Sequence, residues 1–185
     1  MQLALLFSFE TQSLDAHLII TRTRATGLDL NSLTRFMNRA RRQVGVSGEV
    51  NVLLTSNSEM RRLNSRYRNK NTPTDVLSFP APEGNGVAGD IAISVDIAKQ
   101  SARKRGESLG KEVHILMLHG LLHLAGYDHE NDNGKMEREE QRLRKLLRLS
   151  TGLIERSRAT HSSQATSRGP NPRALPTRSR TKRRP

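Results

Sequence analysis

The stretch KEVHILMLHGLLHLAGYDH, residues 111–129, combines a long apolar run with four of the six histidines of the chain. Residues 111–125 predict a helix that is apolar on most of its sides, which is typical of a helix at the centre of a core. Gly126 is expected to end this helix, because glycine readily takes the left-handed backbone conformation of a C-terminal cap. The other elements of the fold should therefore pack around residues 111–125.

The sequence on either side predicts strands and helices in mixed order. Ser56 with Glu59 three residues later forms a capping-box pattern, which marks the start of a helix. Turn-forming residues gather between 80 and 89 and separate two short strands. The predicted helices span residues 30–44, 56–67, 96–105, 111–125 and 136–149, and the predicted strands span residues 49–54, 75–79 and 90–95. Because they do not alternate as regular βαβ units, we expect an α+β fold, a small mixed four-stranded sheet packed with about five helices.

The formal net charge of the 185 residues is +13 at pH 7, and much of it lies at the C-terminal end. Residues 156–185 contain nine lysines and arginines and no acidic residue, so subtracting nine from +13 leaves +4 for residues 1–155. The same segment has four prolines and one large apolar residue, Leu175, which is too little to form a core. We expect one folded domain over residues 1–155 and a disordered basic tail over residues 156–185.

The composition also narrows the class of protein. Without cysteine the chain has no disulfides and no thiolate metal site, which is consistent with a cytoplasmic location. The apolar residues 1–9 lack a basic segment before them, so we expect a buried edge of the core rather than a signal peptide. No stretch approaches the roughly 20 apolar residues of a membrane helix. The positive charge favours nucleic acid over an anionic membrane as the partner.

Three histidines have the spacing of a metal site. His119 and His123 are four residues apart, so on a helix both imidazoles project from the same face. A left-handed turn at Gly126 would bring His129 back over that face. Three nitrogen ligands with an open fourth position are typical of catalytic rather than structural zinc. We predict that these histidines bind one zinc ion, which can lower the pKa of a bound water to roughly 7.

The roles of three neighbouring residues are left open by the sequence. Asp128 stands beside a ligand and either orients an imidazole through its second ring nitrogen, in the second shell of the metal, or is a simple turn residue. His114 falls on a different face of the helix and is expected to pack in the core or to support the ligands. Glu112 is as ambiguous as Asp128.

The histidine spacing matches the zinc-protease pattern H-E-x-x-H-x-x-G-x-x-H except at one position. Gly120 stands where that pattern has a glutamate, which is the general base of peptide hydrolysis. A metalloprotease-like peptide hydrolase therefore lacks its mechanism and is the less favoured alternative. The metal site remains, so its substrate must be sought elsewhere.

The motif HGLLHLAGYDH, residues 119–129, resembles the H-G-x-L-H-L-x-G-Y-D-H signature of the YbeY family of bacterial endoribonucleases. Two upstream blocks, LNSRYRNKNTPTDVLSFP at residues 63–80 and GDIAIS at residues 89–94, resemble the other two blocks of that family in the same order. Asn71 departs from the aspartate that is common in the family at that position. The basic tail lies outside the resemblance, so its role is not inherited.

This resemblance implies a zinc-dependent, single-strand-specific endoribonuclease that acts in ribosomal RNA processing. The implied processes are maturation of the 16S rRNA 3′ end, late small-subunit maturation and ribosome quality control. The resemblance implies that His119, His123 and His129 are the zinc ligands and that Arg68 is a functional arginine. It implies RNA and the 30S ribosomal subunit as partners, together with a ribosomal protein and an assembly GTPase.

Arg68 and its neighbours suit a phosphodiester substrate. A guanidinium can bind two of the oxygens on which negative charge gathers when a phosphodiester is attacked. The alternative is that Arg68 only places a cation at the C-terminal end of the preceding helix. Lys70 either assists as a point charge or is a solvated surface lysine. Tyr67 and Tyr127 have rings that could stack on bases, although core packing is favoured for both.

The basic tail offers further contacts to RNA. Arg183 and Arg184 are candidate RNA-binding residues, and such contacts would make binding steeply salt-dependent. The alternative is a tail that only increases solubility. Because the motif shows no evident protein general base, a non-catalytic, zinc-stabilised ribosome-assembly factor also remains an alternative to the nuclease.

Overall fold

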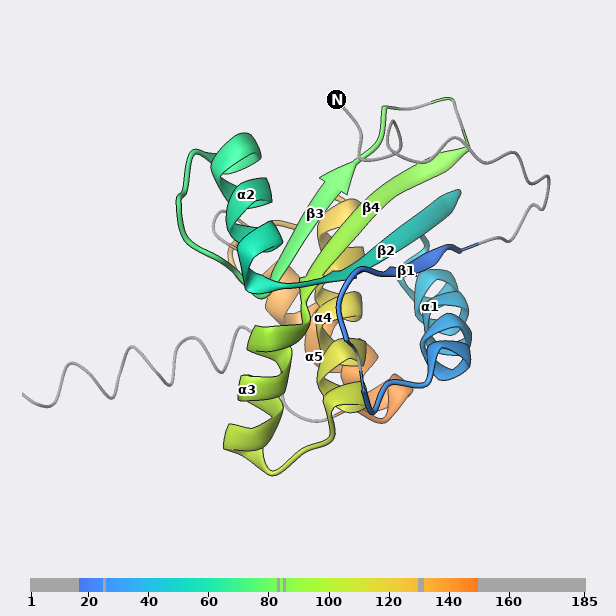
Figure 1. Ribbon diagram of the computed structural model, residues 1–185. Helices are drawn as coiled ribbons and strands as arrows, with labels where there is room; N and C mark the ends of the chain where they lie inside the picture. The colour runs from blue at the N-terminus through green and yellow to red at the C-terminus, as the bar shows by residue number, and fades with distance from the viewer. Residues whose placement is uncertain (1–16, 25, 83, 85, 130–131, 150–185) are drawn as a thin grey trace, which may run out of the picture.

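The computed structural model describes residues 17–24, 26–82, 84, 86–129 and 132–149 (Figure 1). These residues form four strands and five helices around one sheet, which confirms the predicted α+β class. The elements in chain order are β1 (Ile19–Thr21), α1 (Leu30–Val44), β2 (Glu49–Thr55), α2 (Asn57–Arg68), β3 (Val76–Pro80), β4 (Val87–Ser94), α3 (Val95–Arg105), α4 (Leu109–Leu124) and α5 (Lys135–Leu147).

The sheet is mixed, as predicted, with the strand order β1-β2-β4-β3. β1 pairs with β2, and β2 with β4, in parallel, whereas β3 runs antiparallel to β4. The register places Val52 opposite Ile91, at the centre of the sheet. β3 is therefore an edge strand, next to the strand that carries the most buried residues.

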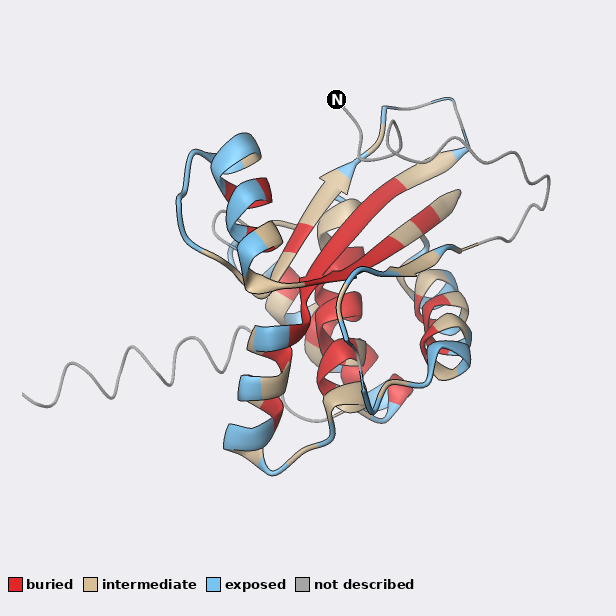
Figure 2. Cartoon of the chain, viewed as in Figure 1, coloured by how far each residue is buried: buried red, intermediate tan, exposed pale blue. Residues whose placement is uncertain are grey.

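The two faces of the sheet are covered unequally. Alternate residues of β2 and β4 point to opposite faces, because successive side chains of a strand do so. Ile91 and Ile93 belong to the large core cluster with α1, α3, α4 and α5, whereas Ala92 belongs to a small cluster with α2. In Figure 1, α2 stands apart from the other four helices, which gather on the other side of the sheet. Buried residues concentrate on β4 and α4, and α2 is largely exposed (Figure 2).

Side-chain caps fix where the helices begin. The Ser56 hydroxyl accepts a hydrogen bond from the backbone N–H of Glu59, which confirms the predicted start of α2. Ser108 accepts from the backbone N–H of Lys111 in the same way, so α4 begins at Leu109, two residues before its predicted start. These caps satisfy N–H groups that the helices leave without partners.

The structure differs from the prediction at two strands. β4 begins at Val87, within the segment that was expected to be a turn, because Val87 pairs with Glu49 and Gly89 pairs with Pro80 across the sheet. The fourth strand is β1, whose three residues follow β2 in parallel. The predicted buried edge at residues 1–9 and the basic tail at residues 156–185 lie outside the described residues. Within the described part of the chain, every helix is too short or too polar to cross a membrane.

Candidate metal centre

α4 is the platform of the site and lies at the centre of the large core. It packs against β3 and β4 on one side and against α1, α3 and α5 on the others. Ten of its sixteen residues are buried, including the polar His119. Because the core surrounds the helix, its side chains are held in place by packing before any ligand binds.

The three predicted ligands come together at the C-terminal end of α4. His119, His123 and His129 each offer one ring nitrogen, and these nitrogens all lie within 4.8 Å of one another. The Nε2 atoms of His119 and His123 are 3.2 Å apart. Two nitrogens bound at about 2.1 Å to a tetrahedral ion lie roughly 3.4 Å apart, so this separation is suited to a tetrahedral metal ion. Gly126 has φ of +86° and turns the chain toward His129, as predicted.

The outer ring nitrogens are held by hydrogen-bond acceptors. The Nδ1 of His119 is 3.1 Å from the Glu140 carboxylate, and the Nδ1 of His123 is 3.0 Å from the backbone carbonyl of Tyr127. Since both partners accept, both Nδ1 atoms carry the proton and donate it, which leaves a lone pair on each Nε2. Two lone pairs that face each other repel unless a cation lies between them. The chemistry of the donor set therefore fits a bound metal ion.

The exposure of the ligands increases from the helix toward the solvent. His119 is buried at 8% exposure, His123 is half-buried and His129 is exposed. Burial lowers the pKa of His123 to about 4, helped by the neighbouring His119 and His129. His123 is therefore neutral at pH 7, as a metal ligand must be. The group is therefore open to solvent on the side of His129.

Gly120 follows the first ligand and faces the sheet. A side-chain carbon at this position would lie 2.9 Å from a methyl carbon of Ile91 and 3.1 Å from the hydroxyl of Ser78. The Ser78 hydroxyl donates a hydrogen bond to the Gly120 carbonyl. The glutamate of the zinc-protease pattern therefore has no room here, which agrees with its absence from the sequence.

Glu140 is the residue of the site that sequence reasoning missed. It lies on α5, 21 positions after the histidine that it contacts, and it is 1% exposed. The sequence left Asp128 open between orienting an imidazole and forming a turn; His119 and His123 have the partners given above, which leaves His129 as the ring that Asp128 would orient. The charge of Asp128 does raise the pKa of His123, against the larger effects that lower it. A charged residue on the apolar face of the predicted last helix was the signal that could have revealed Glu140.

His114 and Glu112, whose roles the sequence left open, have contacts with residues other than the three grouped histidines. The ring of His114 stacks on Phe36 at a centroid distance of 4.2 Å, so packing is its role. Burial lowers the pKa of His114 to about 4, and the charge of Arg39 contributes a smaller part of this shift. Glu112 forms an ion pair with Arg105 of α3 and is not among the three grouped ligands.

The predicted phosphate-binding residues lie at the C-terminal end of α2, the helix on the opposite face of the sheet from α4. Arg68 is the last residue of α2, and Lys70 follows it two positions later; both side chains are exposed. The ring of Tyr67 packs edge-on against Phe79 at a centroid distance of 5.0 Å. Tyr67 and Tyr127 each pack against a core cluster, which confirms the expectation for both.

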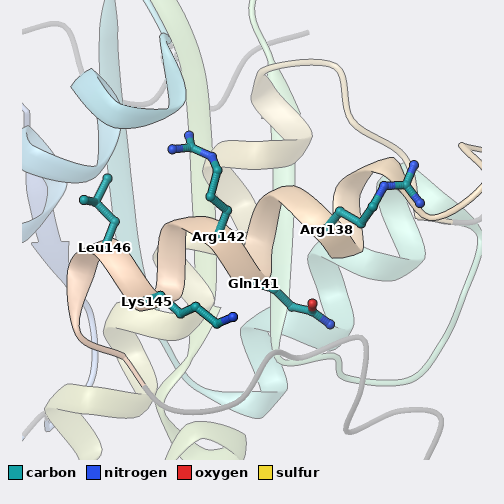
Figure 3. Close-up of a pocket in the computed structure, with 5 residues that line it drawn as sticks. All are labelled: Arg138, Gln141, Arg142, Lys145 and Leu146. Atoms are coloured by element: carbon teal, nitrogen blue, oxygen red, sulfur yellow. The ribbon is translucent and has the colours of Figure 1, made fainter.

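A shallow hollow lies on the outer face of α5, where none of the three histidines lines it. Figure 3 shows the side chains around it, which project from exposed or half-buried positions of the helix. They are Arg138, Gln141, Arg142, Lys145 and Leu146. Arg142 forms two hydrogen bonds with Glu139, so part of this positive charge is already compensated. Among the described residues, the group that could hold a metal ion therefore lies at the three histidines and not at this hollow.

The chain is similar in sequence to known proteins over most of its length. The sequence profile described as Endoribonuclease YbeY matches residues 20–148. A protein of that name from Koribacter versatilis is 53% identical over 140 residues, which are 76% of this chain and 91% of that protein. One from Solibacter usitatus is 46% identical over 125 residues, 68% of this chain and 84% of that protein.

A solved structure shows the same fold. The solution structure of a Thermotoga maritima protein matches with a TM-score of 0.52 at 27% identity, and the match covers 84% of this chain and 100% of that one. The match of the family profile spans every described strand and helix except the first residue of β1. It also contains all three histidines of the candidate metal centre. The chain belongs to the endoribonuclease YbeY family.

Proposed function

We propose that this chain is a zinc-dependent endoribonuclease that cleaves single-stranded ribosomal RNA in the cytoplasm. Its family membership gives the reaction class, which is hydrolysis of RNA. The observation that carries the metal dependence is the convergence of three ring nitrogens within 4.8 Å of one another, two of them with their proton held on the far side of the ring. The proposed processes are 16S rRNA 3′-end maturation, late small-subunit maturation and ribosome quality control.

The proposed site holds one zinc ion per chain on His119, His123 and His129. Zinc bound to three histidines supplies Lewis acidity, which makes a coordinated water acidic near neutral pH. The open side at His129 admits the phosphodiester, since this ligand is the exposed one. Asp128 is the proposed second-shell residue, next to His129 in the chain, and its charge raises the pKa of His123 against the larger effects that lower it.

Arg68 is the proposed partner of the scissile phosphate. Its guanidinium can bind two phosphate oxygens and so offset the negative charge that develops during cleavage. Among the described residues, none forms an ion pair or a hydrogen bond with its side chain, so the guanidinium remains available. Lys70 adds a second positive charge close by in sequence.

The domain organisation follows the charge. Residues 1–155 form the proposed metal-dependent endoribonuclease domain, and residues 156–185 form a basic tail that binds RNA with Arg183 and Arg184 among its contacts. The proposed partners are the 30S ribosomal subunit, a ribosomal protein and an assembly GTPase. Removal of residues 156–185 should weaken RNA binding and flatten its dependence on salt, since fewer cations then replace counterions.

The test compares two histidine variants of the full chain. His129→Ala removes an exposed ligand and leaves the core intact, whereas His114→Phe changes a histidine of the same region that packs on Phe36. The two measurements are zinc content and cleavage of a single-stranded 16S rRNA fragment. His129→Ala should lose zinc and cleavage, and His114→Phe should retain zinc and cleavage. Equal cleavage by His129→Ala would overturn the proposal.

Two further outcomes would identify the alternative functions. A protein that binds zinc and pre-ribosomal particles, but cuts no RNA, would be a zinc-stabilised assembly factor. Cleavage of peptide substrates by the zinc-loaded protein would identify a peptide hydrolase. The close approach of Gly120 to the sheet disfavours the second, because it excludes the glutamate base of that reaction.

A further inference from the structure

The inner face of α5 contains two charges within an otherwise apolar surface. Glu140 and Arg144 are 1% and 2% exposed, one helical turn apart. The other buried residues of this face are Met136, Leu143 and Leu147. Burying a charge is costly unless it is paired, so the two charges need a reason to lie there.

The contacts of the Glu140 carboxylate indicate that reason. One oxygen, Oε1, lies 3.3 Å from the Arg144 guanidinium, and the other, Oε2, lies 3.1 Å from Nδ1 of His119. A carboxylate that only compensated Arg144 could have offered both oxygens to the guanidinium fork. Here the carboxylate divides its oxygens between a cation and a metal-ligating ring.

We propose that Glu140 and Arg144 are positioning residues that hold His119 in the orientation and tautomer required for metal binding. The proposal rests on the metal site of the proposed function and adds a second helix to it. Arg144 compensates the negative charge of Glu140 inside the core, and Glu140 fixes the proton of His119 on Nδ1. The Nε2 lone pair then points toward His123, 3.2 Å away.

Different parts of the chain orient His119 and His123, the two proposed ligands on α4. His123 donates to the Tyr127 carbonyl, four residues along the same chain segment, so its orientation is set locally. His119 depends on α5, which follows α4 and the turn that carries His129. Docking of α5 and metal binding are therefore coupled through one carboxylate. Loss of such a partner typically weakens metal affinity 10- to 100-fold.

The test measures zinc affinity by competition with a zinc-binding dye, beside urea unfolding of the metal-free protein. Glu140→Gln should lower the affinity 10- to 100-fold, because its amide cannot accept from both neighbours. The Glu140→Met protein should also be less stable, since it lacks the carboxylate that lies 3.3 Å from the buried Arg144 guanidinium. Glu139→Gln is the matched control, because Glu139 pairs with Arg142 on the outer side of the same helix.

The double variant Glu140→Met/Arg144→Met separates positioning from mere stabilisation. Replacing a buried pair by apolar side chains often restores stability, so this variant should unfold at a higher urea concentration than Glu140→Met alone. Its zinc affinity should nevertheless stay 10- to 100-fold below that of the wild type. Recovery of zinc affinity together with stability would overturn the proposal, as would wild-type affinity in Glu140→Gln. A wild-type protein that binds no zinc would instead overturn the metal site itself.

Discussion

The face of the sheet that carries α1, α3, α4 and α5 differs from the face that carries α2 in how much apolar surface it buries. Among the described residues, twenty buried apolar side chains form the cluster on the first face and five form the cluster on the second. His119 and His123 lie on α4, on the first face, and Arg68 ends the helix on the second. The arrangement of these two proposed ligands thus depends on a rigid core, whereas the proposed phosphate contact lies at an exposed helix end.

Truncation of one leucine on each face tests this difference directly. Leu121 of α4 is fully buried, whereas Leu63 of α2 is 7% exposed. We expect Leu121→Ala to lower the free energy of unfolding by about 4 kcal/mol and Leu63→Ala by about 2 kcal/mol, because a cavity in the larger core collapses less. Urea unfolding of both variants measures the two costs. Equal costs would mean that the two faces are equally well packed.

A side chain at Gly120 would strain the contact between α4 and the sheet. Gly120→Glu should lower the free energy of unfolding by about 3 kcal/mol, since it combines overpacking against Ile91 with a buried carboxylate. Gly120→Ala should cost less, about 1 kcal/mol, because alanine favours the helix and partly offsets the clash. Thermal unfolding of the two variants checks the order. A Gly120→Glu protein as stable as the wild type would show that α4 and the sheet can move apart to admit the side chain.

Removal of Arg68 should affect cleavage without affecting the metal. Arg68→Met should lower the rate of RNA cleavage about 100-fold, the typical cost of losing one group that stabilises developing charge. Its zinc content and stability should remain those of the wild type, because the side chain is exposed.

The control for that variant is Arg66→Met, which removes another cation from the last turn of α2. The Arg66 guanidinium lies 5.5 Å from the ring centre of Tyr67, so a contact with this ring explains its position without a phosphate. Similar losses of cleavage in both variants would favour a general effect of charge at the helix end over a specific phosphate contact.

Acid should lower the stability of the protein through His114, which packs on the face of the sheet that carries α1, α3, α4 and α5. Its pKa falls from 6.5 to about 4 in the folded protein, chiefly through burial. A histidine with a depressed pKa stabilises the folded state above its unfolded pKa, and this contribution is lost as pH falls from 6.5 toward 4. Between pH 7.5 and 4.5, His114→Phe should lose about 2 kcal/mol less stability than the wild type, after allowance for partial exposure. Urea unfolding of both proteins at the two pH values measures this difference. An equal loss of stability in the wild type and in His114→Phe would contradict the prediction.

The sequence predicted the elements that have strong local signals. The Ser56 cap and the apolar residues 111–125 placed α2 and α4 almost correctly, because capping and helical periodicity act over a few residues. The three histidines came from spacing along one helix and a turn glycine, which is also local information. Their ring nitrogens do come together in the structure, as that spacing predicted, and metal binding by the group stays a prediction.

Features that depend on distant pairing were missed. β1 has only three residues and exists because it pairs with β2, 33 positions away in the register. Val87–Gly89 joined β4 because of partners in β2 and β3, although its own composition favours a turn. Glu140 reaches His119 from another helix, and no spacing rule along the chain relates the two residues.

The buried pair on α5 has a consequence for variation among relatives. A change at Glu140 alone removes a carboxylate that compensates the buried charge of Arg144, and a change at Arg144 alone removes a cation that compensates Glu140. We therefore expect natural sequences to keep both residues or to replace both together, with few intermediates. In this chain Glu140 stands 11 positions after His129, so a glutamate and an arginine one turn apart at that point would extend the recognisable signature of the metal centre beyond its three histidines.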